Sequence, residues 1–293
     1  MAALAFPTAS RAVTVRRHDP APHGPRRMSG RLALVTGASS GIGAAFARIY
    51  AAHGYDLALT ARREDRLAAL ADEVRLAHGV EALVVPADLA DPAAPARLVA
   101  DVTAHGHGID ALVNNAGYGL PQPFAESRWE EQAALLQVMV TAPCELAHRT
   151  LPGMVDRRFG RIVNVASLAG FLPGSPGAGL YSAVKAMLIR FSESLHVELQ
   201  GTGVHVSALC PGFTWTEFHD ANGTREALAS TPTWLWMGAD EVAASGYEAT
   251  EANRPICVPG APNKAAAALS HLLPDEWTMA LMARRGRFGL GKP

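Results

Sequence analysis

The chain has few cysteines, and they do not suggest covalent or metal cross-links. Its 293 residues include three, Cys144, Cys210 and Cys257. An odd number of widely spaced cysteines gives no disulfide framework and no C-x-x-C zinc motif, and it suits a reducing compartment. The sequence also lacks an apolar run approaching the roughly 20 residues needed to span a bilayer. We therefore expect a cytoplasmic protein with no membrane-spanning helix.

The chain also lacks an excess of charge of either sign. Its 26 basic and 27 acidic residues give a formal net charge of −1, which offers no general electrostatic attraction for nucleic acid or for a membrane surface. The 11 histidines are scattered without metal-ligand spacing, so we predict no metal site. Hydrophobic residues at 49% and charged residues at 18% indicate one folded domain with a sizeable core.

The two ends of the chain differ in composition from the middle. Residues 1–29 carry five arginines against the single acid Asp19, together with four prolines and no helix or strand period. This composition predicts a disordered basic extension, and the apolar core of a secretory signal is missing. A functionless extension, an upstream start, and a targeting or contact role all remain open for it. Residues 263–293 predict a helix followed by a basic tail, to which we assign no function.

A glycine-rich turn follows the first apolar segment. The run Leu32–Thr36 has the character of a buried parallel strand and is followed by Gly37. A helical pattern starts near Gly41 and Gly43, so the order is strand, turn, helix. The start of a helix offers unpaired N–H groups and a positive dipole end to a phosphate. The segment therefore predicts a pyrophosphate-binding turn, in which the glycines allow a tight bend and close backbone approach.

Strand and helix patterns alternate along the rest of the chain. We predict strands at 32–36, 55–60, 82–86, 111–114, 160–165, 204–209 and 256–258, and long helices at 130–157 and 181–200. This alternation predicts an α/β fold, with a doubly wound Rossmann-type parallel sheet of about seven strands and helices on both faces. The single domain should span residues 30–262. Ligands of such sheets bind at the carboxyl ends of the strands.

Tyr181 and Lys185 lie four residues apart, so on a helix their side chains share a face. A cation within about 4–6 Å favours the phenolate, so Lys185 should lower the pKa of Tyr181 from about 10 toward neutrality. Such a tyrosine could donate and accept protons near pH 7. Ser167, fourteen residues upstream of Tyr181, follows the predicted strand at 160–165 and should supply a hydroxyl at the same edge of the sheet.

Together these segments resemble the short-chain dehydrogenase/reductase family, in its compact single-domain, NADP(H)-preferring form. The resemblance covers about residues 31–259. It rests on TGASSGIG at 36–43, NNAG at 114–117, Ser167, Tyr181 with Lys185, and Pro211-Gly212 followed by Thr216. It implies an oxidoreductase that moves a hydride between a nicotinamide and a carbonyl or alcohol carbon. Tyr181 would act as the acid/base, with Ser167 and Lys185 as the other catalytic residues, in a homodimer or homotetramer.

The resemblance also implies a set of coenzyme-binding residues. They are Gly37, Ser39, Ser40, Gly41, Ile42, Gly43, Arg62, Arg63, Asp88, Leu89, Asn115, Ala116, Gly117, Tyr181, Lys185, Pro211, Gly212 and Thr216. After the second predicted strand come Arg62 and Arg63, with no acid until Glu64. Guanidinium groups suit a 2′-phosphate, so NADP(H) is preferred and NAD(H) remains possible, although the two arginines could also form a solvated surface.

Segment 213–238 corresponds to the family's mobile substrate lid. Its large apolar side chains, among them Phe218, Trp234 and Leu235, favour an apolar carbonyl or alcohol substrate. One position departs from the family, because Met139 stands where an asparagine usually supports a proton relay. A catalytically weak, nucleotide-binding regulatory protein is therefore a second hypothesis. A third is an interaction protein that acts through the arginine-rich extension.

Overall fold

A parallel sheet of seven strands organises the described residues, which in this computed structural model are 30–280 except 107, 175–177, 224–225, 227 and 275. The predicted N-terminal extension and the basic tail beyond residue 280 lie outside this part of the chain. The strands are β1 (Leu32–Thr36), β2 (Asp56–Thr60), β3 (Ala82–Val84), β4 (Ile109–Asn114), β5 (Gly160–Val165), β6 (Val204–Leu209) and β9 (Ile256–Cys257).

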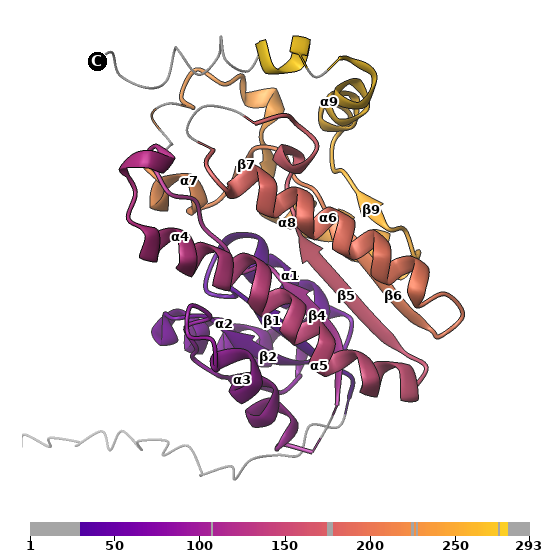
Figure 1. The fold of residues 1–293 in the computed structure, drawn as a ribbon. Helices are drawn as coiled ribbons and strands as arrows, with labels where there is room; N and C mark the ends of the chain where they lie inside the picture. The colour runs from indigo at the N-terminus through magenta and orange to yellow at the C-terminus, as the bar shows by residue number, and fades with distance from the viewer. Residues whose placement is uncertain are drawn as a thin grey trace, which may run out of the picture.

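The order across the sheet is β3-β2-β1-β4-β5-β6-β9, and every pairing is parallel (Figure 1). This confirms the predicted doubly wound sheet. Successive strands run outward from β1 in one direction and from β4 in the other, so a crevice forms where the order reverses. The edge strands β3 and β9 are shorter than predicted. Each stops before a proline, Pro86 or Pro259, which has no N–H to donate to a neighbouring strand.

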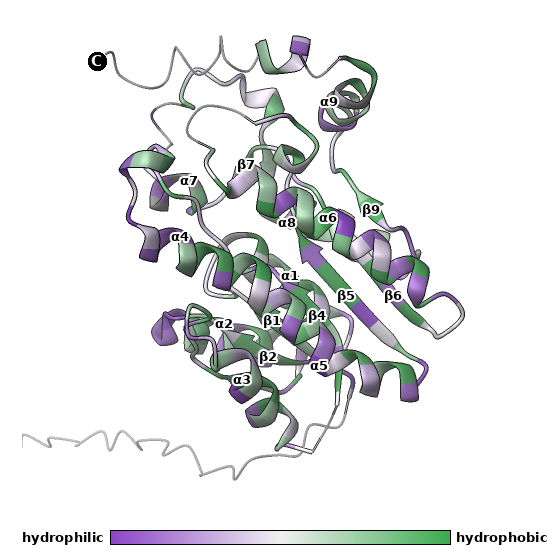
Figure 2. Cartoon of the chain, viewed as in Figure 1, coloured by the Kyte–Doolittle hydropathy of each residue, from purple (hydrophilic) through white to green (hydrophobic). Residues whose placement is uncertain are grey.

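Helices cover both faces of the sheet. On one face α1 (Gly41–Ala52), α2 (Glu64–His78) and α8 (Ala239–Glu251) form a core with β1 and β2 that includes Phe46 and Tyr50. On the other, α3 (Ala94–Thr103), α4 (Trp129–Leu136), α5 (Ala142–Asp156) and α6 (Tyr181–Glu198) surround Leu98 and Leu146. Figure 2 shows hydrophobic residues along the central strands and mixed faces on the surrounding helices. Burial of these apolar faces holds the layers together.

The long helix predicted at 130–157 is interrupted. A π-helical turn, Gln137–Thr141, separates α4 from α5. Pro143 lies in the first turn of α5 and has no N–H to bond to the carbonyl of Met139, four residues earlier. A wider turn is a common response to a lost helical hydrogen bond. The predicted helix is therefore present from Trp129 to Asp156, with a wider turn that the sequence did not predict, and Met139 lies within that turn.

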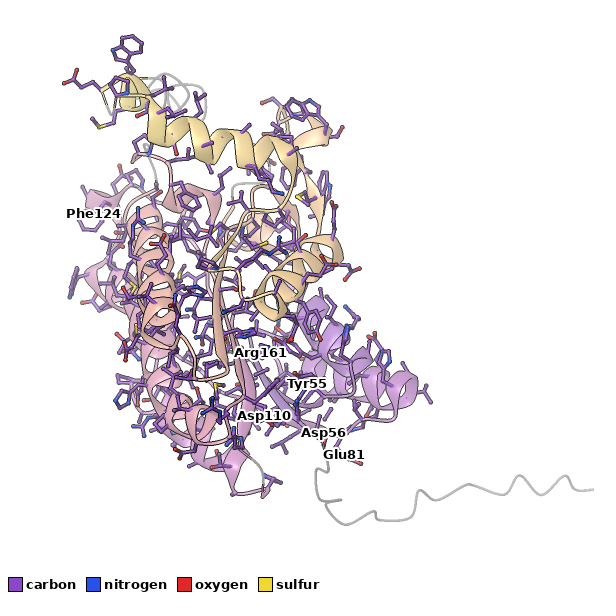
Figure 3. The ribbon with its side chains drawn as sticks, turned by 90° about the vertical axis from the view of Figure 1, so that its right-hand side faces the viewer. Tyr55, Asp56, Glu81, Asp110, Phe124 and Arg161 are labelled. Atoms are coloured by element: carbon purple, nitrogen blue, oxygen red, sulfur yellow. The ribbon has the colours of Figure 1, made fainter. Side chains whose placement is uncertain are left out.

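The amino ends of the strands carry charged side chains, among them Asp56, Asp110 and Arg161 (Figure 3). Asp56 accepts hydrogen bonds from the backbone N–H groups of Gly30 and Glu81. Asp110 accepts one from Leu32, and Arg161, only 8% exposed, pairs with Glu251. These contacts connect the starts of the strands to their surroundings, so the charges at this end have a structural explanation.

The described parts of segment 213–238 contain secondary structure that the sequence analysis did not predict. Its ends form a second, two-stranded sheet, β7 (Thr214–Trp215) and β8 (Met237–Gly238). Between them lie the short helix α7 (Phe218–Ala221) and a 3₁₀ turn, Thr233–Leu235. After β9 the helix α9 (Ala261–Leu272) lies over this segment, near the top of Figure 1. No helix in the described part of the chain is long and apolar enough to cross a membrane.

Candidate active site

A single cavity of about 1380 Å³ opens at the carboxyl ends of the strands. It brings together residues that are far apart in the sequence, from the glycine turn after β1 to the helix α9. All of the predicted catalytic residues and all but one of the predicted coenzyme-binding residues line it, and the exception is Gly43. The sheet topology therefore places the predicted residues where a doubly wound fold binds its ligand.

The glycine turn has the backbone shape that requires glycine. Gly37 and Gly41 have φ angles of +65° and +56°, in the left-handed region that other residues rarely adopt. Gly43 is needed for another reason, since a Cβ there would lie 2.3 Å from the carbonyl oxygen of Gly37. Gly43 therefore packs the start of α1 against the turn and does not itself face the cavity.

The N-terminus of α1 is well suited to an anion. Its N-cap residue, Ser40, makes no side-chain capping hydrogen bond, and the first turn holds no acidic residue. The helix dipole and the first N–H groups are thus left uncompensated by the helix itself. Because Gly41 and Ile42, at this helix start, line the cavity beside the glycine turn, the residues present fit a pyrophosphate group.

Thr36 and Asn115 connect the ends of β1 and β4. The Thr36 hydroxyl donates to the carbonyl of Val113 and accepts from the backbone N–H groups of Asn115 and Ala116. The Asn115 amide donates to the carbonyl oxygens of Thr36 and Gly37, at 3.0 and 3.2 Å. The segment at 114–117 therefore holds the glycine turn in place as well as lining the cavity.

Arg63, at the start of α2, is the centre of a polar cluster at the rim of the cavity. Its guanidinium donates to the hydroxyls of Ser39 and Ser40, at 3.0 and 2.9 Å, and to the carboxylate of Glu217, at 2.8 Å. Arg66 donates to the other oxygen of Glu217. Hydrogen bonds from Arg66 and then Arg63 lower the pKa of Glu217 to about 2, so its carboxylate is charged at neutral pH.

Glu217 was not among the predicted site residues. It belongs to segment 213–238, which the sequence assigned to the substrate side of the cavity. In the structure this carboxylate instead accepts a hydrogen bond from the guanidinium of Arg63, the group expected to hold a 2′-phosphate. No pattern in the sequence linked an acid at 217 to arginines about 150 positions earlier, because only the tertiary fold brings them together.

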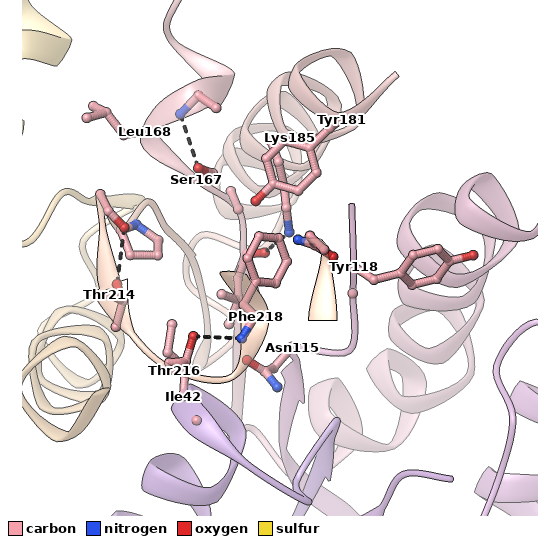
Figure 4. A pocket seen from close by; sticks show the side chains of 18 of the residues that line it. Ile42, Asn115, Tyr118, Ser167, Leu168, Tyr181, Lys185, Thr214, Thr216 and Phe218 are labelled. Atoms are coloured by element: carbon pink, nitrogen blue, oxygen red, sulfur yellow. Dashed lines mark hydrogen bonds between the residues drawn. The ribbon is translucent and has the colours of Figure 1, made fainter. Parts of the chain in front are cut away.

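The three predicted catalytic residues lie on one side of the cavity (Figure 4). Ser167 follows β5, and Tyr181 and Lys185 are in the first turns of α6. The Lys185 ammonium donates to the carbonyl of Val165 at 2.7 Å and lies 5.6 Å from the centre of the Tyr181 ring. The Ser167 hydroxyl accepts from the N–H of Ala169 at 3.1 Å and interacts with Tyr181.

The electrostatics of this trio differ from the prediction. Burial raises the pKa of Tyr181 to about 12, and the hydrogen bond from Ser167 only partly opposes this. Burial also lowers the pKa of Lys185, 5% exposed, to about 8. The expected lowering of the tyrosine pKa by Lys185 is therefore absent. The amine is directed at the Val165 carbonyl and lies over the ring, and loss of water disfavours both charged forms.

Segment 213–238 contacts both halves of the cavity. A Cβ at Gly41 would lie 2.9 Å from the Thr216 methyl group, so Thr216 packs directly on the glycine turn. Phe218 faces Tyr181 with ring centroids 5.9 Å apart. Beside them the rings of Trp215 and Trp236 stack at 4.3 Å. Three consecutive residues, 216–218, thus contact the glycine turn, the arginine cluster and Tyr181.

Met139 is buried beneath the cavity. It is 1% exposed, and a Cβ at Gly117 would lie 3.3 Å from its terminal methyl group. Its neighbour in the π-turn, Val138, lines the cavity. The side chain at 139 therefore fills space against the 114–117 segment and brings no polar group there.

The helix α9 contributes lining residues that the sequence analysis missed. Ala266, Leu269, Ser270 and Leu273 face the cavity. Ala266, the pair Leu269 and Ser270, and Leu273 recur at intervals of three or four residues, which was the available signal, since it puts them on one face of a helix. The analysis identified the helix but gave it no function, because nothing local indicates what that face covers.

Known proteins share the fold and much of the sequence. A family model described as short chain dehydrogenase matches residues 31–227. A fatty acyl-CoA reductase of Mycobacterium tuberculosis is 35% identical over 271 residues, covering 89% of this chain and 86% of the relative. A short-chain dehydrogenase from Sphingobium yanoikuyae, solved with NADPH, has a TM-score of 0.72 and 32% identity over 83% of this chain and 96% of its own. One from Burkholderia phymatum, solved with NAD, has a TM-score of 0.75 and 28% identity over 84% and 95%.

Proposed function

The chain belongs to the short-chain dehydrogenase family, and from that premise we propose that it is an NADP(H)-dependent carbonyl reductase acting on an apolar small molecule. One observation carries the proposal. A single cavity holds the glycine turn and arginines at one end and Ser167, Tyr181 and Lys185 at the other. A dinucleotide bound along the glycine turn would bring its nicotinamide toward the three catalytic residues. When bound, that coenzyme supplies the hydride.

The protein's own residues would control the proton and the charge of the reacting carbonyl. The Tyr181 hydroxyl donates a proton to the carbonyl oxygen as the carbon is reduced. The Ser167 hydroxyl, which lines the same cavity, donates to the same oxygen and stabilises its developing negative charge. Lys185 adds a positive charge beneath the tyrosine ring. The proposed roles of Tyr181, Ser167 and Lys185 use only their own side chains, at the positions that these have in the cavity.

The electrostatics favour reduction over oxidation. A tyrosine with a pKa of about 12 is protonated at neutral pH, as a proton donor must be. Oxidation of an alcohol would instead require the phenolate. We therefore infer that carbonyl reduction is the faster direction near neutral pH.

The polar cluster supports NADP(H) as the preferred coenzyme. Arg62 and Arg63 line the cavity just past β2, where no acidic residue follows the strand that could bind a ribose 2′-hydroxyl. The guanidinium of Arg63 already makes hydrogen bonds to two hydroxyls of the glycine turn, Ser39 and Ser40. A phosphate dianion could accept from the same group. NAD(H) remains a possible, weaker coenzyme.

One relative, named a fatty acyl-CoA reductase, supports an apolar carbonyl substrate. We also propose that the protein works in the cytoplasm as a homodimer or homotetramer. Size measurement by light scattering tests the oligomeric state, and a single-chain mass would contradict it.

A second candidate function follows from Met139. If the proton relay needs a polar group there, the protein would bind NADPH with little turnover and act as a regulator. Met139→Asn would then restore activity, which distinguishes this candidate from the first.

The test of the main proposal is oxidation of NADPH with a panel of ketones and aldehydes. We expect turnover that Tyr181→Phe abolishes while NADPH affinity is retained. Tyr118→Phe is the matched control, because Tyr118 also lines the cavity but its hydroxyl points away from Tyr181 (Figure 4). Turnover that survives Tyr181→Phe would refute the proposed proton donor.

A further inference from the structure

The cavity continues beyond the catalytic residues into a region with no charged lining. Of all its described lining residues, only five are charged, namely Arg62, Arg63, Asp88, Lys185 and Glu217. Arg62 and Arg63 follow β2 and Asp88 follows β3. Glu217 contacts Arg63, and the fifth charged residue is Lys185. Among the described residues, the part bounded by segment 213–238 and α9 therefore offers no charged side chain to a carboxylate or phosphate group.

One wall of this region is a stripe along α9. The residues in and next to this helix that line the cavity are Pro262, Asn263, Ala266, Leu269, Ser270 and Leu273, and the span from Ala266 to Leu273 is about 10 Å along the helix. The helix is fixed at its start, where the amide of Asn263 donates to the carbonyl of Pro259 at 2.8 Å. A Cβ at Gly212 would lie 2.4 Å from that same amide group, so the anchor packs tightly against the loop after β6.

The opposite wall comes from two loops and is also apolar. Leu168 and Leu172 follow the catalytic serine, and Trp234 and Leu235 come from the 3₁₀ turn of segment 213–238. This wall continues directly from Ser167, so a substrate whose carbonyl lies at the serine would extend along it toward α9. We refer to this largely apolar part of the cavity, between Ser167 and α9, as the α9 channel.

Two of the channel's side chains expose apolar surface that a ligand would cover. Leu269 is 52% exposed and Trp234 is 68% exposed. Covering such surface with an apolar ligand is favourable in proportion to the area removed from water. A stripe that extends along a helix in this way suits an extended chain.

We propose that the substrate carries a long, unbranched apolar chain next to its carbonyl group, and that this chain lies in the α9 channel. The inference rests on the proposed reductase function and adds the substrate class and the helix that selects it. Each methylene covered by the channel should raise kcat/KM about two- to fourfold, from the transfer free energy of a buried CH₂ group. The increase should stop once the chain fills the stripe.

The test is kcat/KM of the full chain with NADPH for straight-chain aldehydes from butanal to decanal. We expect a steep rise with length in the unchanged protein. Leu269→Asp should flatten that rise, because it places a charge in the channel, and Leu269→Trp should make the rise stop at a shorter chain. Leu272→Asp is the matched control, since Leu272 lies on the same helix, is 80% exposed and does not line the cavity.

A profile that does not depend on chain length, or an equal effect of Leu269→Asp and Leu272→Asp, would overturn the inference while leaving the reductase function intact. Calorimetric binding of 1-alkanols of the same lengths to the NADP⁺-loaded protein decides the question independently of turnover. Affinity that rises with length and falls in Leu269→Asp supports the channel, and affinity that is independent of length refutes it. Loss of turnover with every aldehyde, beside length-dependent alcohol binding, would count against the proposed function alone.

Discussion

The contact between Arg63 and Glu217 leads to a prediction about coenzyme discrimination. Glu217 and the 2′-phosphate of NADPH are both anions, and both would accept hydrogen bonds from the Arg63 guanidinium. They should therefore compete for it. NADH has no 2′-phosphate, so its binding should not depend on that competition. Changes at the two residues should then affect NADPH affinity in opposite directions.

The structure gives the magnitude of each effect. A hydrogen bond to a charged group contributes about 1.5–3 kcal/mol, and the Arg63 side chain is 42% exposed, which favours the lower value. Arg63→Ala should then weaken NADPH binding about tenfold, at about 1.4 kcal/mol per factor of ten. Exposed ion pairs contribute only about 0.2–1 kcal/mol. Glu217→Gln should therefore strengthen NADPH binding about two- to fivefold.

Calorimetric titration of each variant with NADPH and NADH measures both effects. Glu64→Gln is the control. Glu64 directly follows Arg63 in the first turn of α2, and this substitution also removes one negative charge near Arg63. We expect NADH affinity to change less than twofold in all three variants. Weaker NADPH binding in Glu217→Gln would mean that the carboxylate supports the coenzyme, and an equal loss of NADPH and NADH affinity in Arg63→Ala would exclude 2′-phosphate recognition by Arg63.

The remaining predictions concern pH and packing. With the pKa of Tyr181 at about 12, alcohol oxidation should still rise with pH at pH 10, whereas a plateau near pH 7–8 would contradict a protonated resting tyrosine. With the pKa of Lys185 at about 8, its ammonium is lost above that pH, so carbonyl reduction should decline there, and Lys185→Met should remove this limb of the kcat/KM profile. Gly43→Ala should lower the melting temperature sharply, because its Cβ would meet the Gly37 carbonyl at 2.3 Å, and an unchanged melting temperature in calorimetry would refute that packing argument.

Local patterns were enough to predict the sheet and most of the cavity lining. The apolar runs and the turns after them follow the period of the backbone, so seven strands could be identified without any tertiary information. The rule that parallel strands end at one edge then placed Ser167, Asp88 and the glycine turn together. The errors were at Pro143, where a missing N–H widens the helix at Met139, and at the small sheet β7–β8, whose strands have only two residues each.

The amino-acid sequence by itself determined the identity of the chemical groups and the edge of the sheet at which they gather, because both follow from residue type and strand order. Only the tertiary structure decided their electrostatics and neighbours. The pKa of Tyr181 depends on how much water the fold removes around it, and burial outweighs the charge of Lys185. The pairing of Glu217 with Arg63 and the position of Leu269 on the channel depend on contacts between segments far apart in the chain, and no local pattern specifies such contacts.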